Sequence, residues 1–366
     1  MVRVGERLQR CIRPEDTLSR FGGDEFAMLL EDVPNPRDAV RVAQRIMQEL
    51  RSPFELEGRE LVLRASVGIA LGNGRTEGPG ELLKEADTAM YRAKEEVSGY
   101  RIFEPRMYEQ ALRRLKLEND MRRALEAREF VVHYQPIVDL RTGRVWGVEA
   151  LVRWEHPERG LLEPSEFVAV AEETGLIVPL GERVLGEACR QAVRWQRERP
   201  KADPLVVCVN LSARQLRHPD LARSVKRVLQ SSGLEGGCLC LDITETLYIT
   251  VLEGNTAALN DLKRMGVRLS IDDFGMGYSS LSYLKRLPVD TLKVDRSFVI
   301  GLGEDVEDTA IVQMTISLAH ALGMRIIAEG VQSEQQAQQL KEMGCDLGQG
   351  FYFARPLAPE AMSGLL

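Results

Sequence analysis

Polar side chains stand at the carboxyl-terminal ends of several short apolar runs in the second half of the chain. They are Asn210, Asp242, Asp272, Lys293 and Glu329. If these runs are parallel strands of one barrel, their ends form a single rim, and such barrels build their active sites on that rim. The sequence therefore predicts that these side chains meet around one cavity.

With Glu149 and Asp273, the predicted cavity holds five carboxylates and one amide. Oxygen ligands without His or Cys favour Mg²⁺ or Mn²⁺ over Zn²⁺. The adjacent Asp272 and Asp273 are expected to serve two ions, because metal pairs about 4 Å apart assist displacement at phosphorus. We expect Lys293 to orient the attacking water or to balance charge on the nonbridging oxygens. The alternative is that each acid is only a helix N-cap, a position that favours Asp and Asn.

The scaffold for these residues is expected to be a series of strand and helix units. The apolar runs are rich in branched residues, and a helix-length segment follows each of them, which is typical of parallel β/α units. The runs lie at residues 206–211, 239–243, 267–271, 291–294 and 325–328. They predict an α/β, TIM-like (β/α) barrel over residues 129–366.

A different pattern precedes the barrel. Residues 1–104 alternate predicted helices with short predicted strands, including a hairpin at 21–26 and a helix at 37–50, so an α+β domain is expected there. Residues 105–128 have helical apolar spacing with charges between, which predicts an interdomain helix. A chain of 366 residues also favours two domains over one.

Charge and composition restrict the partners. The net charge of −7 excludes a general attraction to nucleic acid or to an anionic membrane. No apolar run is long enough for a membrane helix, and the amino terminus lacks a signal-peptide pattern, so we expect a cytoplasmic protein.

The six cysteines form no Cys-x-x-Cys pair and mostly lie in apolar runs. They are best interpreted as reduced core thiols. A zinc site formed by Cys238 and Cys240 is the alternative, but strand alternation and the missing second pair count against it.

The segment Glu149-Ala150-Leu151-Val152-Arg153-Trp154 resembles the signature of EAL-domain cyclic di-GMP phosphodiesterases, and seven further motifs occur along the chain in the order that the family has them. The resemblance extends over nearly the whole chain from residue 110. The motifs are Tyr134-Gln135-Pro136-Ile137, Val209-Asn210-Leu211-Ser212, Asp242-Ile243-Thr244-Glu245, Asp272-Asp273-Phe274-Gly275, Lys293-Val294-Asp295-Arg296, Ala328-Glu329-Gly330-Val331 and Gly348-Gln349-Gly350.

This resemblance implies a TIM-like barrel that hydrolyses one phosphodiester bond of cyclic di-GMP to give linear pGpG. It implies catalytic roles for Lys293, Glu329 and Glu149, with Lys293 contacting the nucleophilic water. The implied ligands of a two-metal Mg²⁺ or Mn²⁺ site are Glu149, Asn210, Asp242, Asp272, Asp273 and Glu329. The implied substrate pocket is formed by Gln135, Leu151, Arg153, Asp295 and Gln349. Glu245 is implied to anchor the loop 274–278, which in the family couples metal binding to dimerisation, so a homodimer through the barrel is expected.

Three positions depart from the family. Asp242 stands where the family usually has Glu, which retracts the carboxylate by about 1.5 Å. Met276 replaces a small loop residue, and Gln332 replaces a Glu. An active phosphodiesterase is favoured over the alternative, a catalytically silent cyclic di-GMP receptor that signals through the 105–128 helix.

The segment Phe21-Gly22-Gly23-Asp24-Glu25-Phe26 resembles the hairpin of GGDEF domains, the diguanylate cyclases. Arg13 and Asp16 resemble the family's inhibitory product-binding motif, so GTP or cyclic di-GMP is expected to bind there and modulate the barrel. The family's first strand has no counterpart in the preceding residues, which predicts a partial GGDEF domain over residues 1–104 that does not cyclise GTP. Cyclase activity would require that missing strand, and a plain tight turn is the simpler alternative for the glycines.

Overall fold

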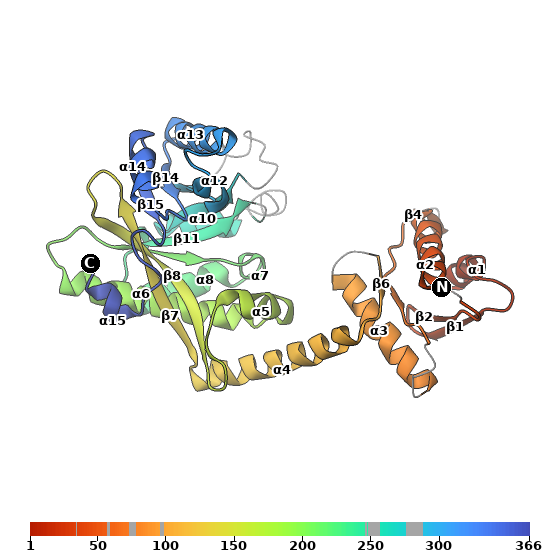
Figure 1. The fold of residues 1–366 in the computed structure, drawn as a ribbon. Coiled ribbons are helices and arrows are strands. Elements are labelled where there is room, and N and C mark those ends of the chain that lie inside the picture. The colour runs from red at the N-terminus through yellow and green to blue at the C-terminus, as the bar shows by residue number, and fades with distance from the viewer. Residues whose placement is uncertain are drawn as a thin grey trace. The chain divides into compact units, whose positions relative to one another are not determined.

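The computed structural model describes residues 1–33, 35–56, 59–72, 78–95, 99–245, 247, 257–275 and 288–366. The chain forms two compact units, Met1–Lys116 and Leu117–Leu366 (Figure 1). The division falls inside the helix α4 (Pro105–Ala127). The domain limits 1–104, 105–128 and 129–366 remain predictions.

The described part of the first unit combines helices with short two-stranded sheets. The helices are α1 (Val2–Gln9), α2 (Pro36–Arg51) and α3 (Pro79–Glu95). The strands pair as β1 (Thr17–Gly22) with β2 (Glu25–Leu29), β3 (Phe54–Leu56) with β4 (Arg59–Leu61), and β5 (Val67–Ile69) with β6 (Tyr100–Ile102). The α2 helix begins where the Asn35 side chain accepts a hydrogen bond from the Arg37 N–H, next to a proline in the first turn. The α+β class predicted for this region is confirmed.

The second unit is a closed barrel (Figure 1). Each strand pairs with the next in chain order, and the last strand returns to the first. A short strand, β9 (Gly160–Leu162), extends the hairpin from β8. Among the described residues the barrel strands are β7 (Phe130–Asp139), β8 (Val145–His156), β10 (Val206–Asn210), β11 (Leu239–Thr244), β12 (Arg268–Phe274), β13 (Thr291–Val294), β14 (Arg325–Ala328) and β15 (Leu347–Gln349). The TIM-like barrel is thereby confirmed.

One strand departs from the expected parallel arrangement. β7 runs antiparallel to both of its neighbours, whereas the strands from β8 to β15 are parallel around the barrel. β7 and β8 are joined by a tight turn, in which the Asp139 carboxylate accepts hydrogen bonds from Thr142 N at 2.7 Å and Oγ1 at 2.9 Å. A connection this short permits only an antiparallel pair, because a parallel pair needs a long crossover.

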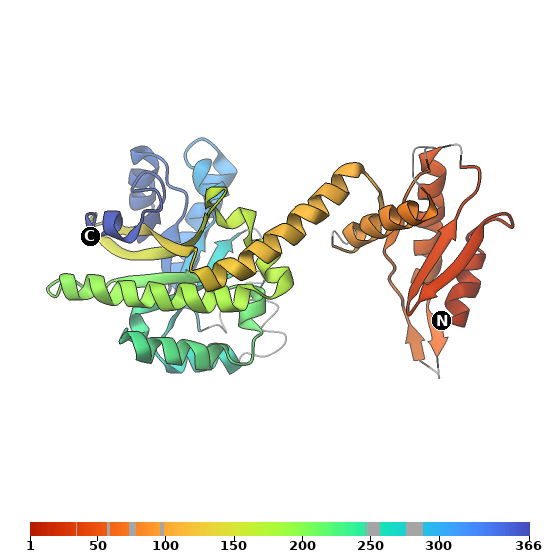
Figure 2. The same cartoon turned by 90° about the horizontal axis from the view of Figure 1, so that it is seen from below.

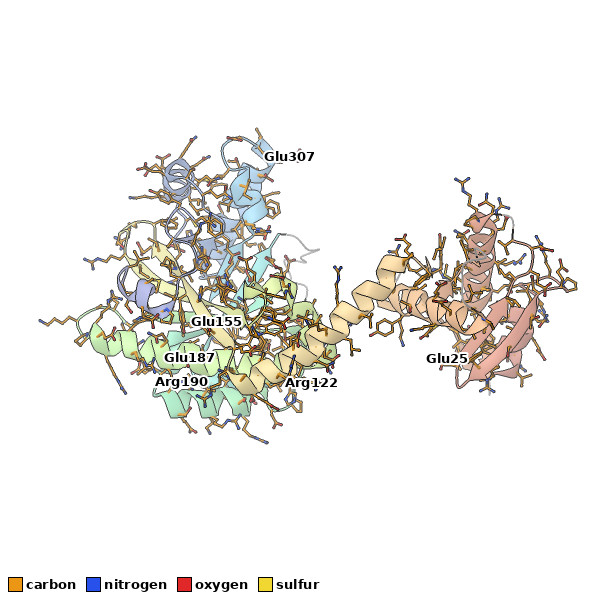
Figure 3. All side chains as sticks on the ribbon, turned by 60° about the horizontal axis from the view of Figure 1, so that its bottom comes forward. Glu25, Arg122, Glu155, Glu187, Arg190 and Glu307 are labelled. Carbon is orange, nitrogen blue, oxygen red and sulfur yellow. The ribbon has the colours of Figure 1, made fainter. Side chains whose placement is uncertain are left out.

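Helices cover the outside of the barrel (Figures 1 and 2). They are α5 (Val168–Thr174), α6 (Ile177–Glu198), α7 (Ala213–Leu216), α8 (Leu221–Ser232), α10 (Ala257–Arg264), α12 (Arg296–Ile300), α13 (Val306–Ala321), α14 (Glu334–Glu342) and α15 (Pro359–Ser363), with 3₁₀ turns at Pro164–Glu166 and Gly236–Cys238. On α6, Glu187 and Arg190 form an exposed ion pair at 2.8 Å (Figure 3). No helix among the described residues is both long and apolar enough to span a membrane.

Strand alternation separates two cores. Residues such as Val207, Leu241 and Ile271 point outward and pack in the main core beneath the helices. The alternate positions, among them Val206 and Ile327, point inward and form a small apolar cluster inside the barrel. At the carboxyl ends of the strands the inward positions become polar, and these positions build the site.

Candidate active site

The ammonium group of Lys293 is the centre of the acidic cluster. Lys293 has 0% exposure, and its Nζ lies 2.6 Å from Glu329 Oε1 and 2.9 Å from Asp242 Oδ2. The same atom lies 3.6 Å from Asp272 Oδ1 and 3.8 Å from Glu149 Oε2. The expectation that acids far apart in the sequence converge on one mouth of the barrel therefore agrees with the geometry.

Burial and the charges of neighbouring groups shift the pKa values of these side chains. Burial by itself lowers the pKa of Lys293, but Asp242, Asp272 and their two neighbouring glutamates raise it well above its ordinary value. Burial raises the pKa of Asp242 to about 6, assisted by the charges of Asp272 and Glu149 and opposed by Lys293. Burial likewise raises the pKa of Glu329. Carboxylates outnumber the ammonium four to one in this cluster, so it retains affinity for a cation.

Amide side chains orient Glu149. The Asn210 Nδ2 donates to Glu149 Oε1 at 2.6 Å, and the Gln349 Nε2 donates to Glu149 Oε2 at 2.5 Å. The Gln349 amide also donates to Gln135 Oε1 at 3.0 Å, and Gln135 in turn donates to the Ala354 carbonyl at 2.9 Å. Strands β7, β8, β10 and β15 thus bring these predicted site residues together.

A bulge in β12 places both adjacent aspartates at the mouth. In a regular strand, neighbouring side chains point to opposite faces. The β12–β13 register shifts between Ile271 and Phe274, and Asp273 has a φ of 54°, in the left-handed region that non-glycine residues rarely adopt. Oxygens of Asp272, Asp273 and Glu329 lie within 4.8 Å of one another as a result.

This donor set fits a hard divalent cation. All three groups offer carboxylate oxygens, which Mg²⁺ and Mn²⁺ prefer, and Asp242 and Glu149 stand beside them around Lys293. Burial raises the pKa of Asp273 to about 6, and Asp272 and Asp295 contribute to the rise. A nearby cation would offset this repulsion.

Asp295 caps a helix. Its Oδ1 accepts a hydrogen bond from the Ser297 N–H at 2.9 Å at the start of α12. Asp295, which was expected to bind substrate, thus also serves as the N-cap of this helix. The helices α7 and α14 are capped by Ser212 and Ser333, so Asn210 and Glu329 are not the capping residues there.

Two further predicted residues are Arg153, expected to bind substrate, and Glu245, expected to anchor the loop. Arg153 is buried on the same face of β8 as Glu149 and Leu151, and its burial lowers its pKa. The Glu245 carboxylate accepts a hydrogen bond from the Gly275 N–H at 3.0 Å, which holds the start of the predicted loop. Met276 and the rest of the loop to residue 278 lie outside the described residues.

Gln332 is exposed. Its backbone N–H donates to Gln336 Oε1 at 2.8 Å, at the entrance to α14. This departure from the family thus stands at a helix start and not among the acids around Lys293.

Two features of the site were not indicated by the sequence patterns. Gly350 passes so close to Val331 that an added Cβ would lie 2.1 Å from the Val331 carbonyl oxygen, and this contact fixes the end of β15 beside Gln349. Cys208 and Cys240 lie beneath Asp242 inside the barrel. The alternation of residues along these strands indicates that the cysteine side chains point into the barrel. It does not indicate which strands become neighbours.

The first unit contains the expected regulatory residues. Arg13 and Asp16 line a cavity of about 280 Å³, together with Arg41 and Arg45. The Asp16 carboxylate accepts hydrogen bonds from the backbone N–H groups of Arg13 at 2.8 Å and Glu31 at 3.1 Å. Asp16 thus shapes the turn that presents Arg13.

Residues 118–356 match the EAL domain family, and residues 1–99 match the family described as diguanylate cyclase, GGDEF domain. The chain belongs to the EAL-domain family. Among EAL relatives, it is 44% identical over 363 residues to the bifunctional diguanylate cyclase/cyclic di-GMP phosphodiesterase MucR of Pseudomonas aeruginosa, covering 99% of this chain and 53% of that protein. It is 38% identical over 348 residues to the cyclic di-GMP phosphodiesterase PdeR of Escherichia coli, covering 95% of this chain and 52% of that protein. The chain spans about half the length of these relatives.

Solved EAL structures share the fold. The MucR phosphodiesterase in complex with cyclic di-GMP is 45% identical, with a TM-score of 0.64 over 68% of this chain and 99% of that chain. The EAL enzyme Bd1971, bound to cAMP and cyclic di-GMP, is 31% identical, with a TM-score of 0.67 over 80% of this chain and 77% of that chain. The tandem GGDEF–EAL resemblance is thereby confirmed.

Proposed function

We propose that the barrel hydrolyses one phosphodiester bond of cyclic di-GMP to give linear pGpG, with Mg²⁺ or Mn²⁺ as cofactor. The observation that carries this proposal is the cluster in which Lys293 is surrounded by four carboxylates from different strands at the mouth of the barrel. The phosphodiesterase relatives support the choice of substrate.

The proposed metal ligands are the predicted ones: Glu149, Asn210, Asp242, Asp272, Asp273 and Glu329. Bound divalent ions would polarise the phosphoryl group and supply an activated water. In this proposal Lys293 holds the water in position and balances charge that develops on the phosphoryl oxygens. Arg153 binds a substrate phosphate, because a guanidinium matches phosphate oxygens in geometry. Gln135, Leu151, Asp295 and Gln349 line the nucleotide pocket, and Glu245 anchors the loop.

The test is release of pGpG from cyclic di-GMP by chelator-treated protein to which Mg²⁺ or Mn²⁺ is returned. Product is expected with added metal and not with chelator. Lys293→Ala and Glu149→Ala are expected to abolish release while the protein still unfolds cooperatively. If folded wild-type protein binds cyclic di-GMP and releases no product with either metal, the hydrolase proposal is wrong.

That last outcome would favour the second candidate, a catalytically silent cyclic di-GMP receptor. The observation behind it is Asp242, whose shorter side chain is paired with Lys293 at 2.9 Å and is buried. A carboxylate held by the lysine is less available to a metal. Asp242→Glu separates the two candidates, because it restores the side-chain length that is usual in the family. The variant is expected to gain pGpG release only if the carboxylate of Asp242 is too short to reach a bound metal.

We also propose regulation and assembly outside the active site. GTP or cyclic di-GMP is proposed to bind at Arg13 and Asp16, where guanidinium groups of the cavity lining can donate hydrogen bonds to phosphate oxygens. Unchanged nucleotide binding in Arg13→Ala would contradict this. A homodimer through the barrel is proposed as in the family, and sedimentation measurements on the full chain test it.

A further inference from the structure

Two buried thiols lie directly beneath the acidic cluster. Cys208 in β10 and Cys240 in β11 are register partners on neighbouring parallel strands, and they are 0% and 1% exposed. Both belong to the small apolar cluster inside the barrel. The Cys240 thiol donates a hydrogen bond to Asp242 Oδ1, with the sulfur 3.6 Å from the oxygen. This arrangement links the interior thiols to a residue of the proposed catalytic site.

The three side chains are close enough to share one ion. One ligand atom from each of Cys208, Cys240 and Asp242 lies within 4.8 Å of the other two. Ligands around a tetrahedral zinc ion bond at about 2.0–2.3 Å, which places them roughly 3.5–4 Å from one another. A small movement of these three side chains is therefore sufficient to bring their ligand atoms to the spacing that a bound ion requires.

Cys208, Cys240 and Asp242 offer two sulfur ligands and one carboxylate, whereas the cluster above them offers only oxygen ligands. Two sulfurs select Zn²⁺ or Cd²⁺ over Mg²⁺ and Mn²⁺, which prefer oxygen. Metal binding to a thiol releases its proton, so a thiophilic ion is the one expected to bind between two buried cysteines. The negative charges of two thiolates alone balance the charge of a divalent ion.

We propose that Cys208, Cys240 and Asp242 form a binding site for a thiophilic divalent cation, Zn²⁺ or Cd²⁺, below the oxygen-ligand centre. The site differs from the zinc site considered from the sequence, because Cys238 packs in the outer core and Cys240 pairs with Cys208 instead. Occupation of the site engages Asp242 and withdraws it from the centre above. The site therefore inhibits hydrolysis, a consequence that rests on the proposed function.

The binding experiment titrates chelator-treated full-length protein with Cd²⁺ and follows the ultraviolet thiolate-to-cadmium charge-transfer band. Wild type is expected to saturate at one equivalent. Cys208→Ala and Cys240→Ala are each expected to weaken Cd²⁺ binding by at least about tenfold. Cys238→Ala is the matched control, because it removes a buried thiol two residues from Cys240 on the outer side, and it is expected to bind as wild type does.

X-ray absorption at the cadmium edge identifies the ligand atoms of the ion in the wild-type complex. Because it uses only wild-type protein, it tests the site even if the alanine variants do not fold. Two sulfur ligands are expected. A cadmium ion with no sulfur ligand, or a band of equal strength in the folded Cys208→Ala/Cys240→Ala protein, would overturn the site.

Inhibition is measured separately, as pGpG release with excess Mn²⁺ relative to each variant's own rate without Cd²⁺. Wild type and Cys238→Ala are expected to lose activity on addition of Cd²⁺, and the double variant is expected to resist it. Equal inhibition of the double variant would refute the inhibitory role. The Cd²⁺-binding measurements are made without cyclic di-GMP. They therefore test the cation site even if the chain releases no pGpG.

Discussion

Acidic motifs occur in both units, but their surroundings differ. At the mouth of the barrel, Asp242 and Glu149 are buried, and they share the ammonium group of Lys293. On the β1–β2 hairpin, Asp24 is exposed. Glu25, next to it, is exposed as well (Figure 3). An exposed acid is solvated by water and has little effect on stability or on a cation's affinity, whereas a buried cluster requires compensation. Acidic residues therefore acquire chemical consequences when the fold brings them together and buries them, and their presence in a motif is not sufficient.

The largest effect is expected for a substitution in the buried acidic cluster of the barrel. Glu149→Gln keeps the shape of the side chain but removes its charge, and its new amide faces the amide donors of Asn210 and Gln349. Its rate of pGpG release is expected to fall about a thousandfold, equivalent to about 4 kcal/mol in activation free energy. The matched control is Glu155→Gln, an exposed position on the same strand (Figure 3), which is expected to retain activity. Equal losses in both variants would show that burial is not what distinguishes Glu149.

A second variant removes the central cation. Lys293→Met is expected to lower the free energy of unfolding by about 3 kcal/mol in the presence of chelator, because it leaves buried carboxylates without their partner. Mn²⁺ is expected to restore part of this stability, since an ion that binds only the folded state stabilises it. Urea unfolding with and without Mn²⁺ measures both effects.

Arg190→Met is the control for that variant. It breaks the exposed pair with Glu187, and it is expected to cost less than about 1 kcal/mol. If Lys293→Met without metal is as stable as wild type, the cluster does not depend on its lysine for compensation.

A third comparison sets one glycine of the barrel against one of the first unit. Gly350→Ala places a Cβ 2.1 Å from the Val331 carbonyl oxygen and is expected to cost about 1–3 kcal/mol of unfolding free energy. Gly80→Ala, in α3, meets no atom within 4 Å and is expected to be neutral or to stabilise by up to about 1 kcal/mol. Thermal unfolding of the full chain reports both, and a stable Gly350→Ala protein would mean that β15 can move away from Val331.

The smallest effect is expected on the hairpin. Asp24→Asn and Glu25→Gln are expected to change the free energy of unfolding by no more than about 0.5 kcal/mol, because both side chains are exposed. Release of pGpG is expected to stay at the wild-type rate. A large loss of activity in either variant would show that the first unit acts on the barrel through this motif.

Local patterns in the sequence predicted the fold class and the residues of the candidate site. Short branched runs followed by helical segments predicted the barrel, and the strand ends at Asp242, Asp272 and Glu329 predicted a common mouth. These signals are local, because strand alternation and helix spacing are read over a few neighbouring residues. The tight turn at Asp139 was also local, yet its consequence, the reversed direction of β7, was not predicted.

Tertiary structure alone decided which strands became neighbours and how their side chains met. Closure of the barrel placed Cys208 beside Cys240 and set the distances from Lys293 to its carboxylates. The β12 bulge turned Asp273 to the same mouth as Asp272, against the alternation that a regular strand imposes. Register and bulges depend on pairing between residues that are distant in the sequence, so no local pattern contains them.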